Sequence, residues 1–552
     1  IIATTQADNI GNWQIIPNTE FSSGEHTIYA RTIDNAGNIS PNSANITFEI
    51  QSFFTVSGKI ILNNFDQDPL ADATIHLGNY NTLSLADGSF VFASVSPGNY
   101  QLSGEREGFI IEPTINNGST SVTSSDINSL ELIASPILVK ELYAPWNGFL
   151  EMINVLELMN TGNFPIEITL RVYATDGFSQ SIPGSAEPIV INVPALTQLD
   201  IVINQLTGFA ADSYGFVKVE HNSEAVDGRV TYYRLADQQS DQLYDFVFTI
   251  PLSNALYNTS SLSFNTFYPT INPALSSSKQ VVQWLSVVNI SEDTAIGFTI
   301  ERFNEAGDLY HIDYLTLEPT ARYDIEGGHE SAGTNRFGLI RIIPNDPTIP
   351  YSAFLSRYVW RIEQDEFDFA TAKLAEQPLS SRIHSILADN DGNTNYIEIA
   401  NPSDTTVTAN IRAYNMQGHQ LSDAEIQFNP REVKHIYGNV LIPAGTIGRF
   451  ELESQSNVAL MAQSFYYHIN NDGIVESAYH MPARTSFGIT MFGSFNLYLG
   501  MTNLVRLTNL TDNITTVTFN FNNNPSLENV YDSQTLAPFT TRDIAVKTKS
   551  SF

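Results

Sequence analysis

The most regular feature of the chain is an alternation of apolar and polar residues in short runs, which asparagine, proline and glycine separate. It is clearest between residues 396 and 482, where Tyr396 to Ile399, Val407 to Tyr414 and Gly448 to Leu452 are three such runs. A period of two residues is typical of half-buried β-strands, and Asn, Pro and Gly are common turn residues. No segment nearby has a sustained period of 3.6 residues. The pattern therefore predicts an all-β chain.

The same order of strands and turns occurs four times between residues 140 and 552. An apolar run ends in a turn asparagine, a second strand follows, and proline opens the next strand. Three copies then carry a strand headed by glycine and an aromatic pair. The turn asparagines are Asn160, Asn289, Asn401 and Asn509, and the prolines are Pro194, Pro319, Pro430 and Pro538. The nearly constant spacing of the asparagines corresponds to one small β-sandwich domain per copy.

Three parts of the chain resemble known families. Residues 8–13 and 24–38, which read DNIGNW and GEHTIYARTIDNAGN, resemble the bacterial Ig-like repeats of giant surface adhesins. Residues 56–102, with Asp87-Gly88 and Pro97-Gly98 at turns, resemble the carboxypeptidase-regulatory-like module, a transthyretin-type sandwich that is not itself catalytic. Residues 140–552 resemble the β-sandwich repeats of secreted bacterial proteins, most clearly at 401–404 and 458–466.

These patterns predict a tandem array of Ig-like and transthyretin-like β-sandwich domains that forms an elongated rod. The predicted domains are the back half of an Ig-like domain (1–50), the carboxypeptidase-regulatory-like sandwich (53–137), three repeats (140–251, 252–372 and 373–484) and the front half of a fourth (485–552). The Ser-, Asn- and Pro-rich segment 252–279 is expected to be a loop or linker. Because alternate strand residues face opposite ways, one residue of each pair, Tyr232-Tyr233 and Tyr466-Tyr467, is expected in a core.

Composition narrows the choice of partners and compartment. The 552 residues include 26 Lys and Arg against 59 Asp and Glu, a net charge of −33, which disfavours nucleic acid and anionic membranes and favours cations. The chain has no cysteine, which excludes disulfides, thiolate catalysis and Cys-type zinc sites. A cysteine-free tandem β array is typical of a bacterial extracellular protein. No run of 18 apolar residues is present, so no membrane insertion is expected.

Candidate chemistry is confined to oxygen-rich turns. The sequence has no G-x-S-x-G, H-E-x-x-H or P-loop motif, and its ten histidines share no ligand spacing, so we expect no enzyme activity. Calcium prefers several carboxylate and carbonyl oxygens on a tight turn. In the Ig-like family such turns often hold calcium near domain junctions, which makes Asp8 with Asn12 and Asp34 with Asn38 candidate ligands. Asp389, Asp391 and Asn393, at alternate positions, form a third set. The alternative interpretation is that these residues only form turns.

The expected function is that of a non-enzymatic structural segment of a bacterial extracellular surface protein, such as a stalk, an adhesin shaft or a filament subunit. Its expected partners are copies of itself, other components of the matrix or surface, and divalent cations. One alternative is a carbohydrate- or protein-binding accessory region of a secreted enzyme, in which exposed aromatic residues would stack on sugars. Another is a viral or phage fibre.

The two ends of the chain each match only half of a domain. About fifty residues bury too little surface for independent stability, and an open sandwich exposes unpaired strand edges. The missing halves could lie in a longer polypeptide, the ends could be simpler folds, or a neighbouring molecule could supply strands by β-augmentation.

Overall fold

In the computed structural model, nearly all of the regular secondary structure is β-strand. The described residues are 1–62, 68–137, 140–162, 165–175, 188–206, 212–223, 225–236, 244–269, 279–361, 366–378, 380–389, 393–471, 475–485, 491, 493–495, 503–519 and 533–546. Within them, the helical elements are α1 (Ile203–Leu206) and the 3₁₀ turns η1 (Asn116–Gly118), η2 (Phe149–Glu151) and η3 (Gly438–Val440). No helix in these ranges has the length and apolarity needed to cross a membrane. The predicted all-β class is confirmed.

The chain divides into two compact units, Ile1–Leu138 and Val139–Phe552. In the first, β1 (Gly24–Ile28) and β2 (Ile46–Ile50) form an antiparallel pair. The following segment forms a sandwich of two four-stranded sheets, in the orders β6-β3-β10-β8 and β5-β4-β7-β9. These strands are β3 (Phe54–Leu62), β4 (Thr74–Leu77), β5 (Tyr80–Leu83), β6 (Ser89–Val95), β7 (Gly98–Glu105), β8 (Phe109–Pro113), β9 (Ser119–Val122) and β10 (Ile127–Pro136). Its core includes Val56, Ile60, Phe90, Leu102 and Leu132.

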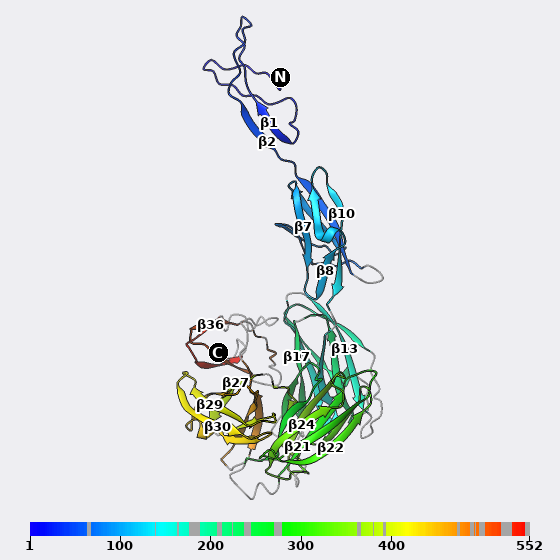
Figure 1. Ribbon diagram of the computed structural model, residues 1–552, viewed down its shortest axis with the longest axis vertical. Helices are drawn as coiled ribbons and strands as arrows, with labels where there is room; N and C mark the ends of the chain where they lie inside the picture. The colour runs from blue at the N-terminus through cyan, green and yellow to red at the C-terminus, as the bar shows by residue number, and fades with distance from the viewer. Residues whose placement is uncertain are drawn as a thin grey trace. The chain divides into compact units, whose positions relative to one another are not determined.

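The second unit contains three eight-stranded sandwiches with one strand order (Figure 1). In each sandwich, the strands of one sheet lie in the order first, sixth, third, fourth. Those of the other sheet lie in the order fifth, second, seventh, eighth. Repeat 1 comprises β11 (Lys140–Asn147), β12 (Ile153–Asn160), β13 (Ile166–Thr175), β14 (Ile189–Val193), β15 (Thr197–Val202), β16 (Tyr214–His221), β17 (Val226–Leu235) and β18 (Tyr244–Pro251). Repeat 2 comprises β19 (Ser260–Asn265), β20 (Lys279–Asn289), β21 (Ile296–Phe303), β22 (Leu309–Leu317), β23 (Arg322–Glu326), β24 (Phe337–Pro344), β25 (Tyr351–Arg361) and β26 (Glu366–Leu374).

Repeat 3 comprises β27 (Arg382–Asp389), β28 (Asn393–Ala400), β29 (Val407–Asn415), β30 (Gln420–Phe428), β31 (Val433–Tyr437), β32 (Thr446–Ser454), β33 (Met461–Ile469) and β34 (Val475–Pro482). Repeat 4 is described at β35 (Asn503–Thr508), β36 (Thr515–Thr518), β37 (Ser533–Leu536) and β38 (Thr541–Val546). In repeat 4, β35 pairs with β38 and β36 with β37, as the second strand pairs with the fifth and the third with the fourth in the other repeats. The structure thus confirms a tandem array of β-sandwiches.

The turn asparagine has the same role in all four repeats. Its side chain is buried, and its Nδ2 group donates to backbone carbonyls that precede the proline-led strand. Its Oδ1 atom accepts from the backbone N–H two residues further on, at Gly162, Ser291, Ser403 and Thr511. Because these buried polar groups are satisfied by one another, the asparagine fixes the distance between the second and fifth strands. This contact explains why an asparagine recurs at the same place in every repeat.

The segment 252–279 is not simply a linker, contrary to the sequence-based expectation. It contains β19, whose six residues are all buried. Ser261 of β19 and Glu376 exchange two backbone hydrogen bonds, which also pair β19 with the end of repeat 2. Its serine and asparagine content suggested a loop, but two of these polar side chains, Ser263 and Asn265, contact Glu398 of the neighbouring repeat. A strand buried on both faces lacks the alternation by which strands are recognised.

Both members of each aromatic pair are buried, whereas the alternation predicts one. Tyr232 and Tyr233 are 2% and 8% exposed, and Tyr466 and Tyr467 are both 0% exposed. The ring of Tyr467 packs against Phe369 of repeat 2, and Tyr466 stacks on Tyr479 at 4.7 Å between ring centroids. In repeat 3, therefore, the preceding repeat covers the sheet face that would otherwise be exposed.

Candidate functional site

The predicted cation ligands of the first unit form two identical turns. In each turn, the aspartate Oδ1 accepts from the backbone N–H groups two and four residues later. The Oδ2 atom accepts from the side chain of the asparagine four residues later, at 3.2 Å between Asp8 and Asn12 and 2.8 Å between Asp34 and Asn38. These hydrogen bonds lower the pKa of both aspartates, the backbone N–H of Asn12 contributing most at Asp8 and the Asn38 side chain most at Asp34.

The geometry of these turns gives the four residues a clear local role. Each carboxylate closes its own loop, as Asp and Asn commonly do in turns. Within the described residues, no group of three or more His, Asp or Glu is placed to hold a metal ion. Calcium binding at Asp8, Asn12, Asp34 and Asn38 stays a prediction.

The third predicted set lies at the end of β27. The Asp389 backbone carbonyl accepts from the Gly445 N–H, and partial burial raises the pKa of the Asp389 carboxyl. Asp391 and the side chain of Asn393 lie outside the described residues. The structure therefore describes one of the three predicted ligands here.

The most elaborate arrangement of polar side chains lies instead where consecutive repeats meet. Between repeats 1 and 2, the Arg322 guanidinium is buried and donates to the carbonyls of Trp146 and Gly215, at 2.8 and 2.9 Å. It pairs with Asp324 at 2.9 Å and lies over the rings of Tyr214 and Phe354. One side chain of repeat 2 thus binds two strands of repeat 1.

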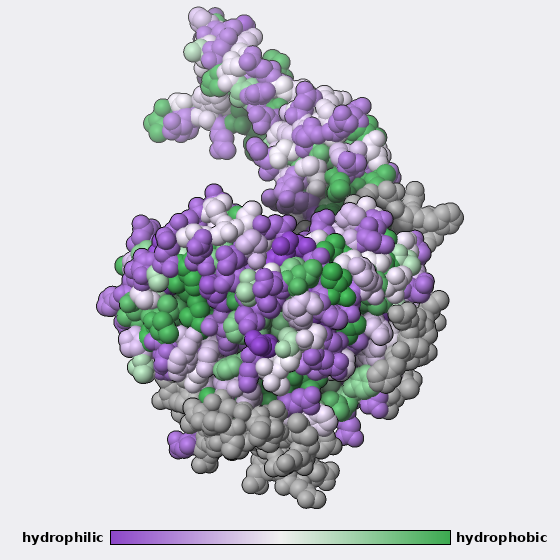
Figure 2. Space-filling model, turned by 60° about the horizontal axis from the view of Figure 1, so that its bottom comes forward, coloured by the Kyte–Doolittle hydropathy of each residue, from purple (hydrophilic) through white to green (hydrophobic). Residues whose placement is uncertain are grey.

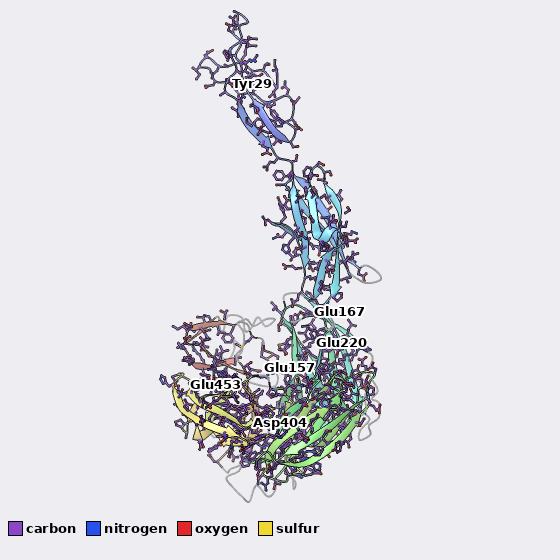
Figure 3. All side chains as sticks on the ribbon, viewed as in Figure 1. Tyr29, Glu157, Glu167, Glu220, Asp404 and Glu453 are labelled. Carbon is purple, nitrogen blue, oxygen red and sulfur yellow. The ribbon has the colours of Figure 1, made fainter. Side chains whose placement is uncertain are left out.

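A second ionic cluster crosses the same junction. Lys218 of repeat 1 contacts Glu141 and Glu220 of its own sheet and Glu292 of repeat 2, all within 2.9 Å. Burial opposes the charge of this amine, but the three carboxylates outweigh burial and raise its pKa above the ordinary value. Glu220, labelled in Figure 3, also pairs with Arg171 at 3.0 Å.

Apolar packing joins the same two repeats. Phe246 on β18 makes edge contacts with Tyr358 and Phe367 of repeat 2, and β18 lies beside β26. Phe354 and Tyr358 of repeat 2 belong to the same buried cluster as the core of repeat 1. The two sandwiches therefore share one continuous core, unlike separate domains that a flexible linker joins.

The junction between repeats 2 and 3 is centred on the buried carboxylate of Glu398, which is 1% exposed at its side chain. It accepts from Ser263 and Asn265 of repeat 2 and from Gln463 of repeat 3. Lys373 Nζ lies 3.7 Å from its Oε2 atom and 2.7 Å from Ser263 Oγ. A buried charge is tolerated when it is paired and fully hydrogen-bonded, as this one is.

Around this centre, further contacts join repeats 2 and 3. Arg357 of repeat 2 donates to the Tyr467 hydroxyl at 2.8 Å and lies over the rings of Phe369 and Phe465. Nearer the surface, Asp404 of repeat 3, labelled in Figure 3, pairs with Arg341 of repeat 2 at 3.3 Å. Both charged and aromatic groups thus contribute to the interface.

One backbone contact recurs at two successive junctions. The Val433 N–H donates to the carbonyl of Glu305 at 3.1 Å, and the Thr541 N–H donates to the carbonyl of Met416 at 2.8 Å. In both cases the donor is the third residue after the strand-opening proline, and the acceptor lies in the glycine turn of the preceding repeat. The turn glycines, Gly307 and Gly418, have positive φ.

Glycine is needed at this contact for a second reason. A Cβ atom on Gly307 would lie 2.1 Å from the carbonyl oxygen of Pro430, and one on Gly418 would lie 2.8 Å from the backbone of Phe539. The sequence pattern of a glycine turn and a proline-led strand therefore encodes the junction as well as the domain. Reasoning from single domains missed this role, although the recurrence of both residues was visible.

Charged residues within strands were a second signal of buried polar contacts, across a junction at Glu398 and within one repeat at Glu157 and Arg506. Glu157, Glu398 and Arg506 occupy equivalent positions, three residues before the turn asparagine. Glu157 is paired with Arg229 at 2.7 Å, and Arg506 with Asp543 at 2.5 Å. A charged residue in an otherwise apolar strand indicates a polar partner on the facing surface.

Comparisons with known proteins give distant structural similarities. No protein-family model and no curated protein matches the sequence. A structure of the Bacillus anthracis TIE protein is similar at a TM-score of 0.18 and 11% identity, over 62% of this chain and 56% of that one. The major pilin SpaD of Corynebacterium diphtheriae gives a TM-score of 0.15 and 9% identity, over 55% of this chain and 86% of the pilin. A tetra-tandem repeat from the extending region of a large adhesion protein gives 0.10 and 10%, over 78% and 99%.

Proposed function

We propose that the chain is a non-enzymatic structural segment of a bacterial extracellular surface protein, such as a stalk, an adhesin shaft or a filament subunit. The observation that carries the proposal is the recurrence of one docking contact, from glycine turn to proline-led strand, between repeats 2 and 3 and between repeats 3 and 4. A contact that recurs in register lets each repeat hold the next in the same way. Such a chain functions as a spacer or support.

The energetics of the junctions support a mechanical role. Burying one large apolar side chain contributes about 1.5–3 kcal/mol, and Phe354, Tyr358, Phe465 and Tyr467 are all at least 92% buried. Arg322 and Glu398 add hydrogen bonds that are satisfied when the neighbouring repeat is in place. Separating two repeats would expose the aromatic faces, remove the carbonyl acceptors of Arg322 and leave Glu398 without Lys373, which resists bending and pulling.

The accessible surface also fits a support. Figure 2 shows polar residues over most of the visible face, with apolar residues in small separate groups. The aromatic pairs that could have stacked on sugars are buried, so they are not available as a carbohydrate platform. Asp and Glu exceed Lys and Arg by 33, which favours repulsion between like molecules outside specific contacts.

Single-molecule pulling of the full chain between its termini tests the proposal. We expect repeats 1 to 3 to resist force together. Gly307→Val blocks the turn at the junction and should lower the unfolding force. Gly333→Val serves as the control, because a Cβ atom at Gly333 meets nothing within 4 Å and its φ is equally positive. Equal forces for both variants would contradict the proposed role of the junction. Tight binding of the full chain to a defined oligosaccharide would favour the accessory-region alternative.

A further inference from the structure

One position on the second strand differs in charge from repeat to repeat, although the fold around it is the same. It lies three residues before the turn asparagine. In repeats 1 to 4 it is occupied by Glu157, Ser286, Glu398 and Arg506. The position thus holds an anion, a hydroxyl group or a cation on equivalent strands, and the surroundings of the two glutamates show what distinguishes the repeats.

The two glutamates differ in where their partners come from. Glu157, labelled in Figure 3, is 0% exposed and pairs with Arg229 at 2.7 Å. It also accepts from the Thr231 hydroxyl at 2.7 Å, and both partners belong to repeat 1. Glu398 is equally buried, but the amine that pairs with it is that of Lys373 in repeat 2. The charge of Glu157 is therefore balanced inside its own sandwich, whereas that of Glu398 is balanced across a junction.

Repeat 2 supplies three groups to the Glu398 carboxylate. Its Oε2 atom accepts from Ser263 Oγ at 2.9 Å and lies 3.7 Å from Lys373 Nζ, and its Oε1 atom accepts from Asn265 Nδ2. Burial alone would raise the pKa of Glu398, but neighbouring cations, Lys373 first, outweigh burial and lower it. The carboxylate is thus charged within the junction, and it needs the donors that repeat 2 presents.

The corresponding faces of repeats 1 and 3 lack most of these donors. Ser263 and Asn265 lie on the first strand, opposite the residues that follow and precede the glycine of the sixth strand. The residues at these two positions are Pro145 and Asn147 in repeat 1, and Ile386 and Ala388 in repeat 3. The eighth strands β18 and β34 contain no lysine to replace Lys373 of β26. Repeat 1 therefore presents one of the three donors, and repeat 3 presents none of them at these positions.

We propose that Glu398 selects the docking partner of repeat 3: it accepts the face of repeat 2 and rejects the corresponding faces of repeats 1 and 3, whether in the same chain or in a second copy. On either wrong face the carboxylate would be buried without the Lys373 amine. Breaking a buried ion pair from one side weakens an association by roughly 100-fold or more. Selection of this kind works by penalising the wrong partner. The inference concerns the order of docking and holds whether or not the chain is a surface support.

A double-mutant cycle in the full chain tests the selection. The Val433 N–H donates to the Glu305 carbonyl across the junction, so hydrogen exchange at Val433 reports separation of repeats 2 and 3. Ser263→Ala/Lys373→Met removes the two donors that both wrong faces lack, and it should speed this exchange roughly 100-fold or more. Adding Glu398→Leu should bring the rate back to within about tenfold of wild type, because no charge is then buried without a partner.

The matched control is Glu157→Leu, the same substitution at the equivalent position of repeat 1. Because the partners of Glu157 lie in its own repeat, this variant should leave exchange at Val433 unchanged. An unchanged rate in Ser263→Ala/Lys373→Met overturns the proposal. So does a fast rate, or a failure to fold, that Glu398→Leu does not relieve, because the donors would then act on the structure of repeat 2 rather than through the carboxylate.

Discussion

Replacing Arg322 by leucine removes the polar centre of the junction between repeats 1 and 2 while keeping apolar contact with Tyr214 and Phe354. The substitution removes the guanidinium that pairs with Asp324 and donates to the carbonyls of Trp146 and Gly215. Breaking a buried ion pair from one side typically costs about 3–5 kcal/mol. Because the Asp324 side chain is 23% exposed, water can partly compensate, and we expect a loss near the lower limit, about 3 kcal/mol.

The matched control is Arg336→Leu, which breaks an ion pair on the surface of the same repeat. Arg336 lies 2.8 Å from Glu305, but the two side chains are 55% and 39% exposed. Pairs of this kind contribute about 0–1 kcal/mol. Both variants replace arginine by leucine, but the ion pairs that they break are expected to contribute to stability by amounts that differ several-fold.

The assay must report on the junction, because unfolding of several coupled domains is not a two-state process. Hydrogen exchange in β11 and β16, which carry Trp146 and Gly215, reports local opening. We expect faster exchange there in Arg322→Leu than in Arg336→Leu, together with a lower urea midpoint for repeats 1 and 2. The double variant Arg322→Leu/Asp324→Leu should recover part of the loss, because it removes the unpaired carboxylate. Equal exchange and equal midpoints in the two single variants would refute the reasoning.

Three further predictions test other parts of the structure. Burial lowers the pKa values of His435 and His480 to about 4, below the ordinary value of 6.5. The unfolded chain therefore binds protons at a higher pH than the folded chain, and stability should fall as the pH drops from 6.5 to 4. Urea titrations across that range check the sign, and stability that rises on acidification contradicts it. Asn401→Ala removes buried hydrogen bonds and should lower the free energy of unfolding of repeat 3 by about 2–4 kcal/mol, which limited proteolysis measures. Asn410→Ala loses one exposed contact and is the control. If the turns at Asp8 and Asp34 bind calcium, millimolar calcium should raise the melting temperature of the first unit, and Asp34→Ala should abolish the rise; no shift with calcium counts against these ligands.

The strands and repeats could be predicted because their information is local. Alternation in β29 and the turn chemistry at Asn401 depend on residues close in sequence, and both match the structure. The junctions could not be predicted in the same way, because Arg322 and Glu398 act across surfaces whose facing residues lie more than a hundred positions away. The misassigned segment around β19 shows the same limit, since its Ser263 and Asn265 side chains hydrogen-bond to Glu398 of repeat 3.

The covering of one repeat by the next has a consequence for how the array can be divided. A repeat cut out at its boundaries would carry bare aromatic rings and ionic groups without counterions on the surface that its neighbour normally covers. In stacked repeats of this kind, stability is the sum of an intrinsic part and a nearest-neighbour part, so folding propagates from one module into the next. Cooperative folding then depends on which repeats are neighbours. Shuffling the repeats would disrupt it even if every individual sandwich kept its sequence.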